Sequence, residues 1–187
     1  MKSAPFWMVC MLLCGLVSPA MGTAAEMHAD ALKAAGIEFH ISARTPEQTR
    51  AFYSARGLPE DAVHAIAQVC LLTVGMRNNR SDVVWLELAE WRFIDDEGRP
   101  VQRIQRIEWD AVWEQMAVPN AGRATFGWTQ LPESRDLQPG EPVGGNLAVV
   151  PPQGNFTLQA SFKTGVSKNG PVIRFNVPKL NCGGGMP

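Results

Sequence analysis

The sequence of 187 residues has little histidine and little cysteine, and it lacks long runs of one charge. Its three histidines, His28, His40 and His64, are far apart, and no G-x-S-x-G motif is present. A Ser-His-Asp hydrolase needs a histidine oriented beside an activated serine, so no pattern for that chemistry exists here. The net charge is -1 with acids and bases interspersed, which predicts no nucleic-acid partner.

Long apolar runs are also missing, except at the N-terminus. Lys2 gives a short positive region, residues 6–17 are apolar, and small residues follow up to Ala25. This pattern predicts a cleaved signal peptide over residues 1–25 and a mature protein of about 160 residues, periplasmic or secreted. A lipid anchor at Cys14 is the alternative. No later segment is apolar for long enough to cross a membrane.

Loss of this leader would remove Cys10 and Cys14 and leave only Cys70 and Cys182. An even pair in an oxidising compartment predicts one disulfide. It would close a long loop, for which the chain-entropy model gives about 4–5 kcal/mol. Two free thiols or a metal site are the alternatives, but no C-x-x-C motif or histidine lies near either cysteine.

The segment before residue 70 is predicted to be largely helical, with residues 26–69 packing on the rest of the domain. Residues 24–35 are rich in alanine, with apolar residues at helical spacing, which favours a short helix or a frayed chain end. Strict alternation of apolar and polar residues predicts a short strand at residues 37–41.

The clearest helix start follows this strand. Thr45 is a capping residue, Pro46 suits the first helical position, and Gln48 completes a capping box. Pro59 begins a second helix with an apolar face. The two helices are expected to form a helical hairpin over residues 45–69, on the N-terminal side of the domain.

Residues 70–182 are typical of a β-sandwich, because short strand-forming runs alternate with turns rich in glycine and proline. Strands are expected at residues 70–76, 101–106, 125–129, 147–150, 156–163 and 172–177, with two more between 83 and 93. The fold class predicted is mainly β, α+β at the margin, with about seven or eight strands. In 156–162 the alternation is clean, so one face should be buried and the other wet. Residues 183–187 are expected to be a flexible tail.

The stretch from Asp82 to Ile107 has the highest density of strand-forming residues. Its alternation slips at Ala89–Glu90, which predicts a bulge or a bend. After a turn at residues 95–98 the chain is expected to return as a strand to about residue 106. The apolar spacing of this return is closer to helical than to β, and a short helix is expected at 109–116.

A further turn has the pattern L-x-P-G-E, in Leu137-Gln138-Pro139-Gly140-Glu141, and two alternating strands follow it. This arrangement resembles the late part of immunoglobulin-like sandwiches, over about fifty residues of the chain. The resemblance implies an architecture, and it carries no functional residues across.

Tryptophan and arginine are the residues that most favour a binding surface, since both recur in interaction hot spots. Five tryptophans follow the leader: Trp85, Trp91, Trp109, Trp113 and Trp128. The candidates for a shared exposed face are Trp85, Arg103, Arg106, Trp109 and Trp113. In the alternative interpretation most of the tryptophans lie in the core.

Three functional hypotheses follow, from different classes. The leading one is an exported, non-catalytic accessory or interaction protein without a cofactor, whose partner is another exported protein. The second is a copper-handling protein, because imidazole and thioether ligands suit copper; its candidate ligands are His40, His64, Met76 and Met116. The third is a hydrolase that uses two carboxylates, drawn from Glu87, Glu90, Glu108, Asp110 and Glu114.

Overall fold

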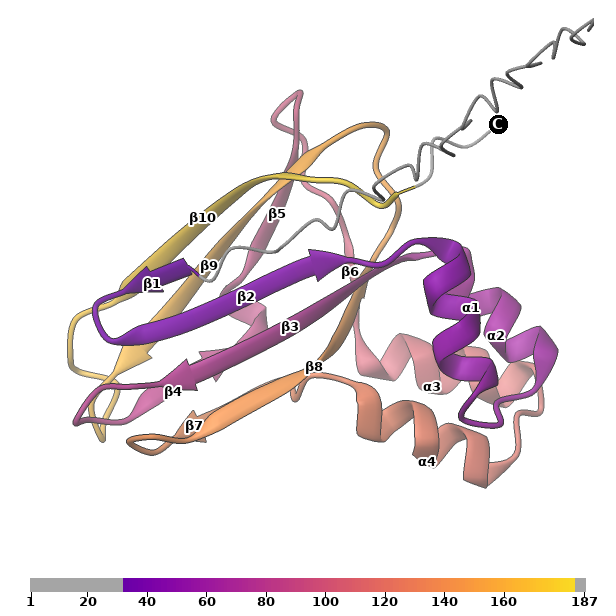
Figure 1. Cartoon of the computed structure of the whole chain (residues 1–187), viewed down its shortest axis with the longest axis horizontal. Helices are drawn as coiled ribbons and strands as arrows, with labels where there is room; N and C mark the ends of the chain where they lie inside the picture. The colour runs from indigo at the N-terminus through magenta and orange to yellow at the C-terminus, as the bar shows by residue number, and fades with distance from the viewer. Residues whose placement is uncertain (1–31, 184–187) are drawn as a thin grey trace, which may run out of the picture.

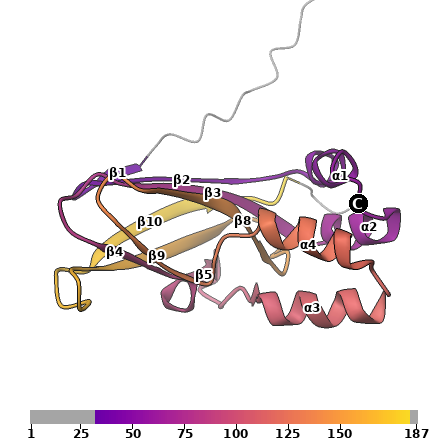
Figure 2. The same cartoon turned by 90° about the horizontal axis from the view of Figure 1, so that it is seen from below.

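The computed structural model describes residues 32–183, which build two mostly antiparallel β-sheets and four α-helices (Figure 1). The mainly β class predicted from the sequence is therefore confirmed. The helices lie together at one end of the two sheets (Figure 2). The predicted signal peptide and residues 184–187 of the predicted tail lie outside the described residues.

The first sheet has the strand order β1-β2-β3-β8-β6. Its strands are β1 (Leu32–Ala34), β2 (Ile37–Ala43), β3 (Cys70–Asn78), β8 (Pro142–Val149) and β6 (Arg103–Ile104). Because β2 pairs with β3 along its length, strands from both sides of residue 70 belong to one sheet.

The prediction of a helix or a frayed end was wrong for residues 32–34, which form β1. Ala35 and Gly36 both have positive φ, 46° and 80°. Two such residues match the tight hairpin turn whose twist suits antiparallel strands. The turn brings Leu32 opposite Phe39, so pairing in the sheet replaces the helix that the alanine content favoured.

The second sheet has the order β10-β9-β4-β7, and β5 also pairs with β9. Its strands are β10 (Ile173–Leu180), β9 (Phe156–Thr164), β4 (Val84–Glu87), β7 (Ser134–Leu137) and β5 (Arg92–Asp95). Strands β4 and β5 pair with successive parts of β9.

A single 3-10 turn, η1 (Leu88–Glu90), separates β4 from β5. It lies where the alternation slips in the sequence, so the predicted break at Ala89–Glu90 is a 3-10 turn rather than a bulge. The extra residues change the parity of the strand. Trp91 and Phe93 therefore face the same core as Leu86.

The expected return strand after Asp95–Gly98 is mostly absent. The returning chain pairs with the first arm at a single antiparallel bridge, Ile94 with Pro100, and its strand, β6, then pairs with β8 in the first sheet. The helical spacing that the sequence shows here belongs to α3 (Arg106–Gln115), which begins at a capping box between Gln105 and Glu108. A helix start therefore ends the strand early.

The strand predicted at residues 125–129 was also wrong, since this segment is the end of α4 (Asn120–Thr129). Phe126 packs against Trp109 and Trp113, with ring centroids 5.1 Å and 4.9 Å away. This contact is available only to a helix lying beside α3. Tertiary packing overrides the β propensity of the local residues.

Two hydrophobic cores result from this arrangement. The larger one lies between the two sheets, where Phe39, Phe162 and Phe175 contact one another. The smaller one lies between the helices and the outer face of the first sheet, which supplies Leu71 and Ala148.

Helices α1 (Pro46–Ser54) and α2 (Glu60–Ala67) cover one end of this outer face together with α3 and α4. The capping box of Thr45 and Gln48 is present as the sequence predicts. In the part of the chain that the structure describes, no helix combines the length and apolar character needed to cross a bilayer.

Candidate functional site

The five predicted Trp and Arg binding residues do not share one exposed face. Trp109 and Trp113 are 5% and 1% exposed, stacked on each other with centroids 4.9 Å apart in the helical core. Neither offers a contact surface to a partner. The alternative interpretation, burial in the core, holds for both of these residues and for Trp91, which lies between the sheets.

Trp85 is half-buried on the outer face of β4, and its indole N–H already forms a hydrogen bond within the protein. Its indole N–H donates to the carbonyl of Gly165 at 2.8 Å, and the Lys168 ammonium lies over its ring, 4.4 Å from the centroid. Because this ammonium already occupies the face of the ring, that face is not free to bind the cation of a ligand. Trp85 thus orders the turn after β9.

The two predicted arginines differ from each other. Arg103 makes a bidentate ion pair with Glu133, at 2.8 Å and 2.7 Å, and its side chain is largely buried. Such a pair fixes both side chains in one geometry. Arg106 is exposed at the start of α3, and among the described residues its side chain has no acidic partner.

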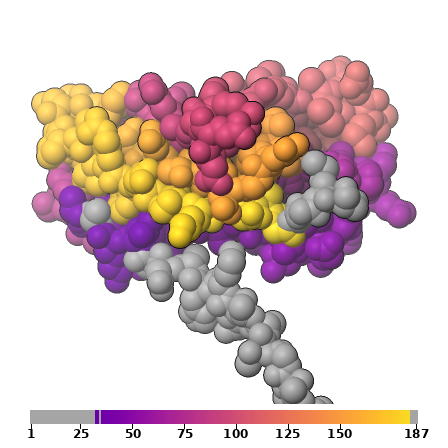
Figure 3. Space-filling model, turned by 90° about the horizontal axis from the view of Figure 1, so that it is seen from above, coloured from indigo at the N-terminus to yellow at the C-terminus, as the bar shows by residue number. Residues whose placement is uncertain are grey.

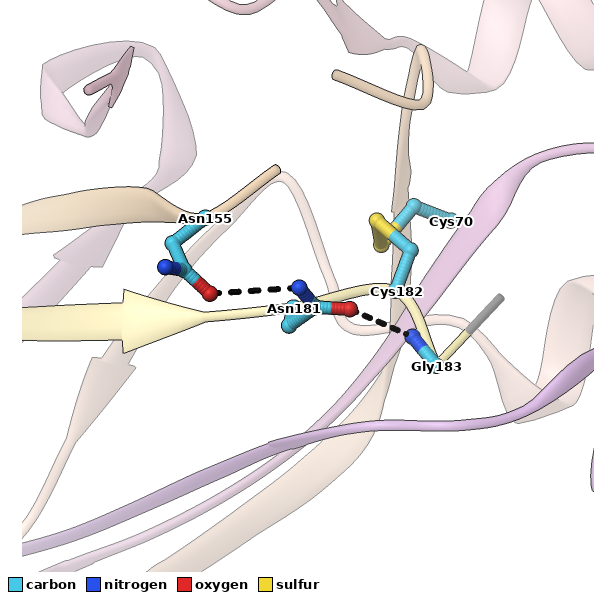
Figure 4. Close-up of a disulfide and its surroundings, with 5 residues drawn as sticks. All are labelled: Cys70, Asn155, Asn181, Cys182 and Gly183. Atoms are coloured by element: carbon cyan, nitrogen blue, oxygen red, sulfur yellow. Dashed lines mark hydrogen bonds between the residues drawn. A yellow bond between two sulfur atoms is a disulfide. The ribbon is translucent and has the colours of Figure 1, made fainter. Parts of the chain in front are cut away.

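The predicted disulfide between Cys70 and Cys182 is present, and the two residues are 112 positions apart (Figure 4). It joins the first residue of β3 to the segment after β10, and so it links the two sheets. Asn181, beside it, donates to the side-chain oxygen of Asn155 at 3.1 Å and accepts from the backbone N–H of Gly183 at 3.0 Å.

The four candidate copper ligands are divided among three places. His40 lies on the outer face of β2, 3.3 Å from a carboxylate oxygen of Glu38, whereas Met76 is buried between the sheets. His64 and Met116 line one cleft of about 840 Å³, formed by α1, α2 and the end of α3. Residues 32–183 contain no cluster of three or more His, Cys, Asp or Glu side chains placed for a metal.

Three of the five candidate carboxylates are engaged in ion pairs or a cap, and the other two, Asp110 and Glu114, are exposed on α3. Glu87 contacts Lys168 and Lys163, and Glu90 contacts Lys163 at 3.0 Å. The hydrogen bond from Lys168 lowers the pKa of Glu87. A glycosidase acid needs the opposite shift, so this environment does not prepare Glu87 for that role. Glu108 caps the start of α3.

The sequence did not identify a polar groove of about 620 Å³ on the outer face of the second sheet. Arg92, Gln159, Ser161, Arg174 and Asn176 supply the polar part of its lining, with Glu90 at its margin. The chain places β9 and β10 side by side along this surface (Figure 3).

The alternation of the strands produces this groove. In β9 and β10 the apolar residues face the core, and the intervening residues face outward. The wet face that the sequence predicts for residues 156–162 is therefore half of the groove. The sequence did not show that Arg92 and Arg174 line the rest of the groove. Their position depends on the register of β5 and β10 against β9.

Comparisons with known proteins add little. No family model and no curated protein matches the chain. The crystal structure of the yjhA protein from Bacillus subtilis is similar to 81% of this chain and 96% of its own, with a TM-score of 0.44 at 16% identity. The structure described as a "putative lipoprotein (ycdA)" from Bacillus subtilis subsp. subtilis str. 168 matches 80% of this chain and 38% of its own, with a TM-score of 0.43 at 11% identity.

Proposed function

We propose that the protein is an exported, non-catalytic binding module, and that the groove on the second sheet is its contact surface. The observation that carries this proposal is the pair Arg92 and Arg174, which line one groove and have no acidic partner among the described residues. Unpaired guanidinium groups on a fixed sheet form a site for an anionic ligand.

Export is supported by the leader pattern and by the disulfide, which persists in oxidising compartments. We propose a periplasmic or secreted location on these grounds. The two sheets, their shared core and the L-x-P-G-E turn support an immunoglobulin-like sandwich with a helical hairpin at residues 45–69. A site built on strands is held more rigidly than a site on loops, which suits a binding module.

A non-catalytic role is supported by the chemistry of the groove. Its one carboxylate, Glu90, is held by Lys163 at 3.0 Å. Acid–base hydrolysis of a glycosidic bond needs two carboxylates on either side of the bond. The described lining offers one carboxylate, two guanidinium groups, two carboxamides and one hydroxyl, a set that can bind and orient a ligand.

The test uses the full chain, expressed in a bacterium and recovered from the periplasmic fraction. Hydrogen exchange of β9 and β10 is followed with three probes: polygalacturonate, polyglutamate and vesicles containing phosphatidylglycerol. We expect at least one probe to protect the groove without change in its own length. Recovery in the cytoplasm alone contradicts export, and binding of no probe, or cleavage of a probe, contradicts the binding module.

Copper handling is a second candidate, favoured by one observation: His64 and Met116 line the same cleft. Glu60 lies one helical turn before His64, on the same side of α2. Titration of the full chain with Cu(I) and Cu(II) tests this function. We expect His64→Ala and Met116→Leu each to weaken binding about tenfold or more. Equal binding by the wild type and both variants would contradict it.

A further inference from the structure

The groove carries a more specific inference, because the pairing of its strands fixes the order of its polar groups. Gln159 of β9 lies directly opposite Arg92 of β5 on one side and Asn176 of β10 on the other. Neighbouring strands are about 4.8 Å apart, so this row spans about 10 Å. A guanidinium and two carboxamides therefore lie in a line across the strands.

A second row lies beside the first. Ser161, two residues along β9, is opposite Arg174 of β10. On the other side of Ser161 the chain has the turn η1, and the Ser161 hydroxyl donates to the carbonyl of Glu90 at 3.2 Å. The two arginines thus occupy diagonal corners of the groove, with the amide and hydroxyl groups between them.

The charges of the surrounding side chains favour an anion. Lys163 lies 3.0 Å from Glu90 and 3.5 Å from Glu87, so the nearby acids are already paired. No other acid lines the groove. Arg92 and Arg174 are exposed, and none of the ion pairs among the described residues includes them. The groove therefore presents two positive charges to a ligand.

The uncharged groups of the groove distinguish between classes of anion. Carboxamides and hydroxyls both donate and accept hydrogen bonds, and so do the hydroxyls of a sugar. The apolar lining residues, Ala160 and Phe175, are 1% and 6% exposed, and offer little surface to a peptide side chain or a lipid tail. The lining therefore suits a polyhydroxylated anion better than an acidic peptide or a membrane.

We propose that the groove binds an acidic oligosaccharide of the uronate type. The guanidinium groups of Arg92 and Arg174 bind carboxylates on two sugar units, and Gln159, Ser161 and Asn176 bind hydroxyls on the chain between them. This inference rests on the proposed function and adds to it the chemical class of the ligand.

The experiment is a calorimetric titration of the full chain with oligogalacturonate. We expect Arg92→Ala and Arg174→Ala each to weaken binding about tenfold or more, the loss typical of one charged hydrogen bond. Arg92→Lys should lose part of the affinity, because lysine keeps the charge but not the bidentate geometry. The matched control is Arg106→Ala, which removes an exposed arginine outside the groove and should bind as the wild type does.

Two further titrations separate the ligand class from the binding function. Neutral dextran should not bind, and polyglutamate should bind at least tenfold more weakly than oligogalacturonate. Equal binding of dextran, or preferred binding of polyglutamate to the groove, overturns the glycan proposal and leaves the binding module intact. Unchanged affinity in both arginine variants, with melting curves that show a folded protein, overturns the assignment of the groove itself.

Discussion

The helix-covered end of the first sheet's outer face differs sharply from the outer face of the second sheet, although both arise from antiparallel strands. On the first sheet, Leu71 of β3 and Ala148 of β8 point outward and are 0% and 1% exposed beneath the helices. On the second sheet the outward positions of β9 and β10, such as Gln159 and Asn176, are polar and exposed. The helices cover the apolar end of the first sheet's outer face, and the polar groove on the second sheet stays open.

This difference shows where a binding surface is to be sought. An outward apolar residue needs a covering layer to be removed from water. The tryptophans that suggested a binding surface in the sequence, Trp109 and Trp113, belong to that covering layer. The open face keeps polar groups that need no cover, so its side chains are available to a ligand. Burial has the structural role at one face, and the other face presents polar groups that can form hydrogen bonds.

The largest expected effect comes from the disulfide that links the two sheets. Cys182→Ser removes the bond to Cys70 and releases a loop of 112 residues. The chain-entropy model gives a loss of about 5 kcal/mol in the free energy of unfolding. Urea denaturation of the wild type and the variant measures it. Reduction should destabilise the wild type by a similar amount and leave the variant unchanged; a response of the variant to reductant would contradict this account.

The covered face is tested by Trp113→Ala. Trp113 is 1% exposed and packs on Trp109 and Phe126, so its loss leaves a cavity beneath the helices. We expect a loss of about 3–5 kcal/mol in denaturant unfolding. Trp128→Ala is the matched control, because Trp128 lies on α4 and is 90% exposed. Its expected change is within about 0.5 kcal/mol, and similar losses in both variants would argue against the helical core.

A smaller effect is expected from the polar group buried between helices and sheet. The hydroxyl of Tyr53 contacts Thr129 at 2.9 Å, Gln130 at 3.1 Å and Asn146 at 3.5 Å. Tyr53→Phe leaves these groups with fewer partners and should cost about 1–3 kcal/mol. On the open face, Asn176→Ala should change the unfolding free energy by less than about 0.5 kcal/mol. Similar losses of unfolding free energy in Tyr53→Phe and Asn176→Ala would mean that the side chains of the open face also stabilise the fold.

The smallest effect concerns the ion pairs that border the groove. The hydrogen bond from Lys168 lowers the pKa of Glu87. A carboxyl whose pKa is lower in the folded state stabilises the protein above its unfolded pKa of about 4.3, and this stabilisation is lost as the pH falls through the folded pKa.

We therefore expect Glu87→Gln to lose less than about 1 kcal/mol at neutral pH, since the pair is near the surface. The difference from the wild type should shrink as the pH falls through the folded pKa of Glu87, which lies below its unfolded pKa. Unfolding free energies measured from pH 7 to pH 3 test this prediction. A difference that does not decrease as the pH falls would show that packing, and not charge, is responsible.

Local chemistry explains which elements the sequence predicted well. The capping box of Thr45 and Gln48 and the clean alternation of 156–162 are complete within a few residues, and both are present in the structure. The break at Ala89–Glu90 was visible as a change of parity, although its 3-10 form was not. These signals depend on neighbours along the chain, which a sequence displays directly.

Contacts between distant residues explain what the sequence did not predict. Residues 125–129 have strand-forming character, but packing of Phe126 against Trp109 and Trp113 makes them helical. Likewise, the chain returns along β5 only as far as the bridge between Ile94 and Pro100, and β6 then pairs with β8. In both cases the deciding contact comes from a residue that the local pattern does not include.

The sequence alone determined the mainly β class, the pairing of Cys70 with Cys182, and the polar face of the strand at 156–162. Composition, cysteine parity and alternation are sufficient for these, because each depends on residue type and spacing. Only the tertiary structure decided that the helices bury two tryptophans. It also decided that Arg92 and Arg174 line the same groove from opposite sides of β9. The register between strands places those charges, and a shift of one residue would turn either side chain to the opposite face.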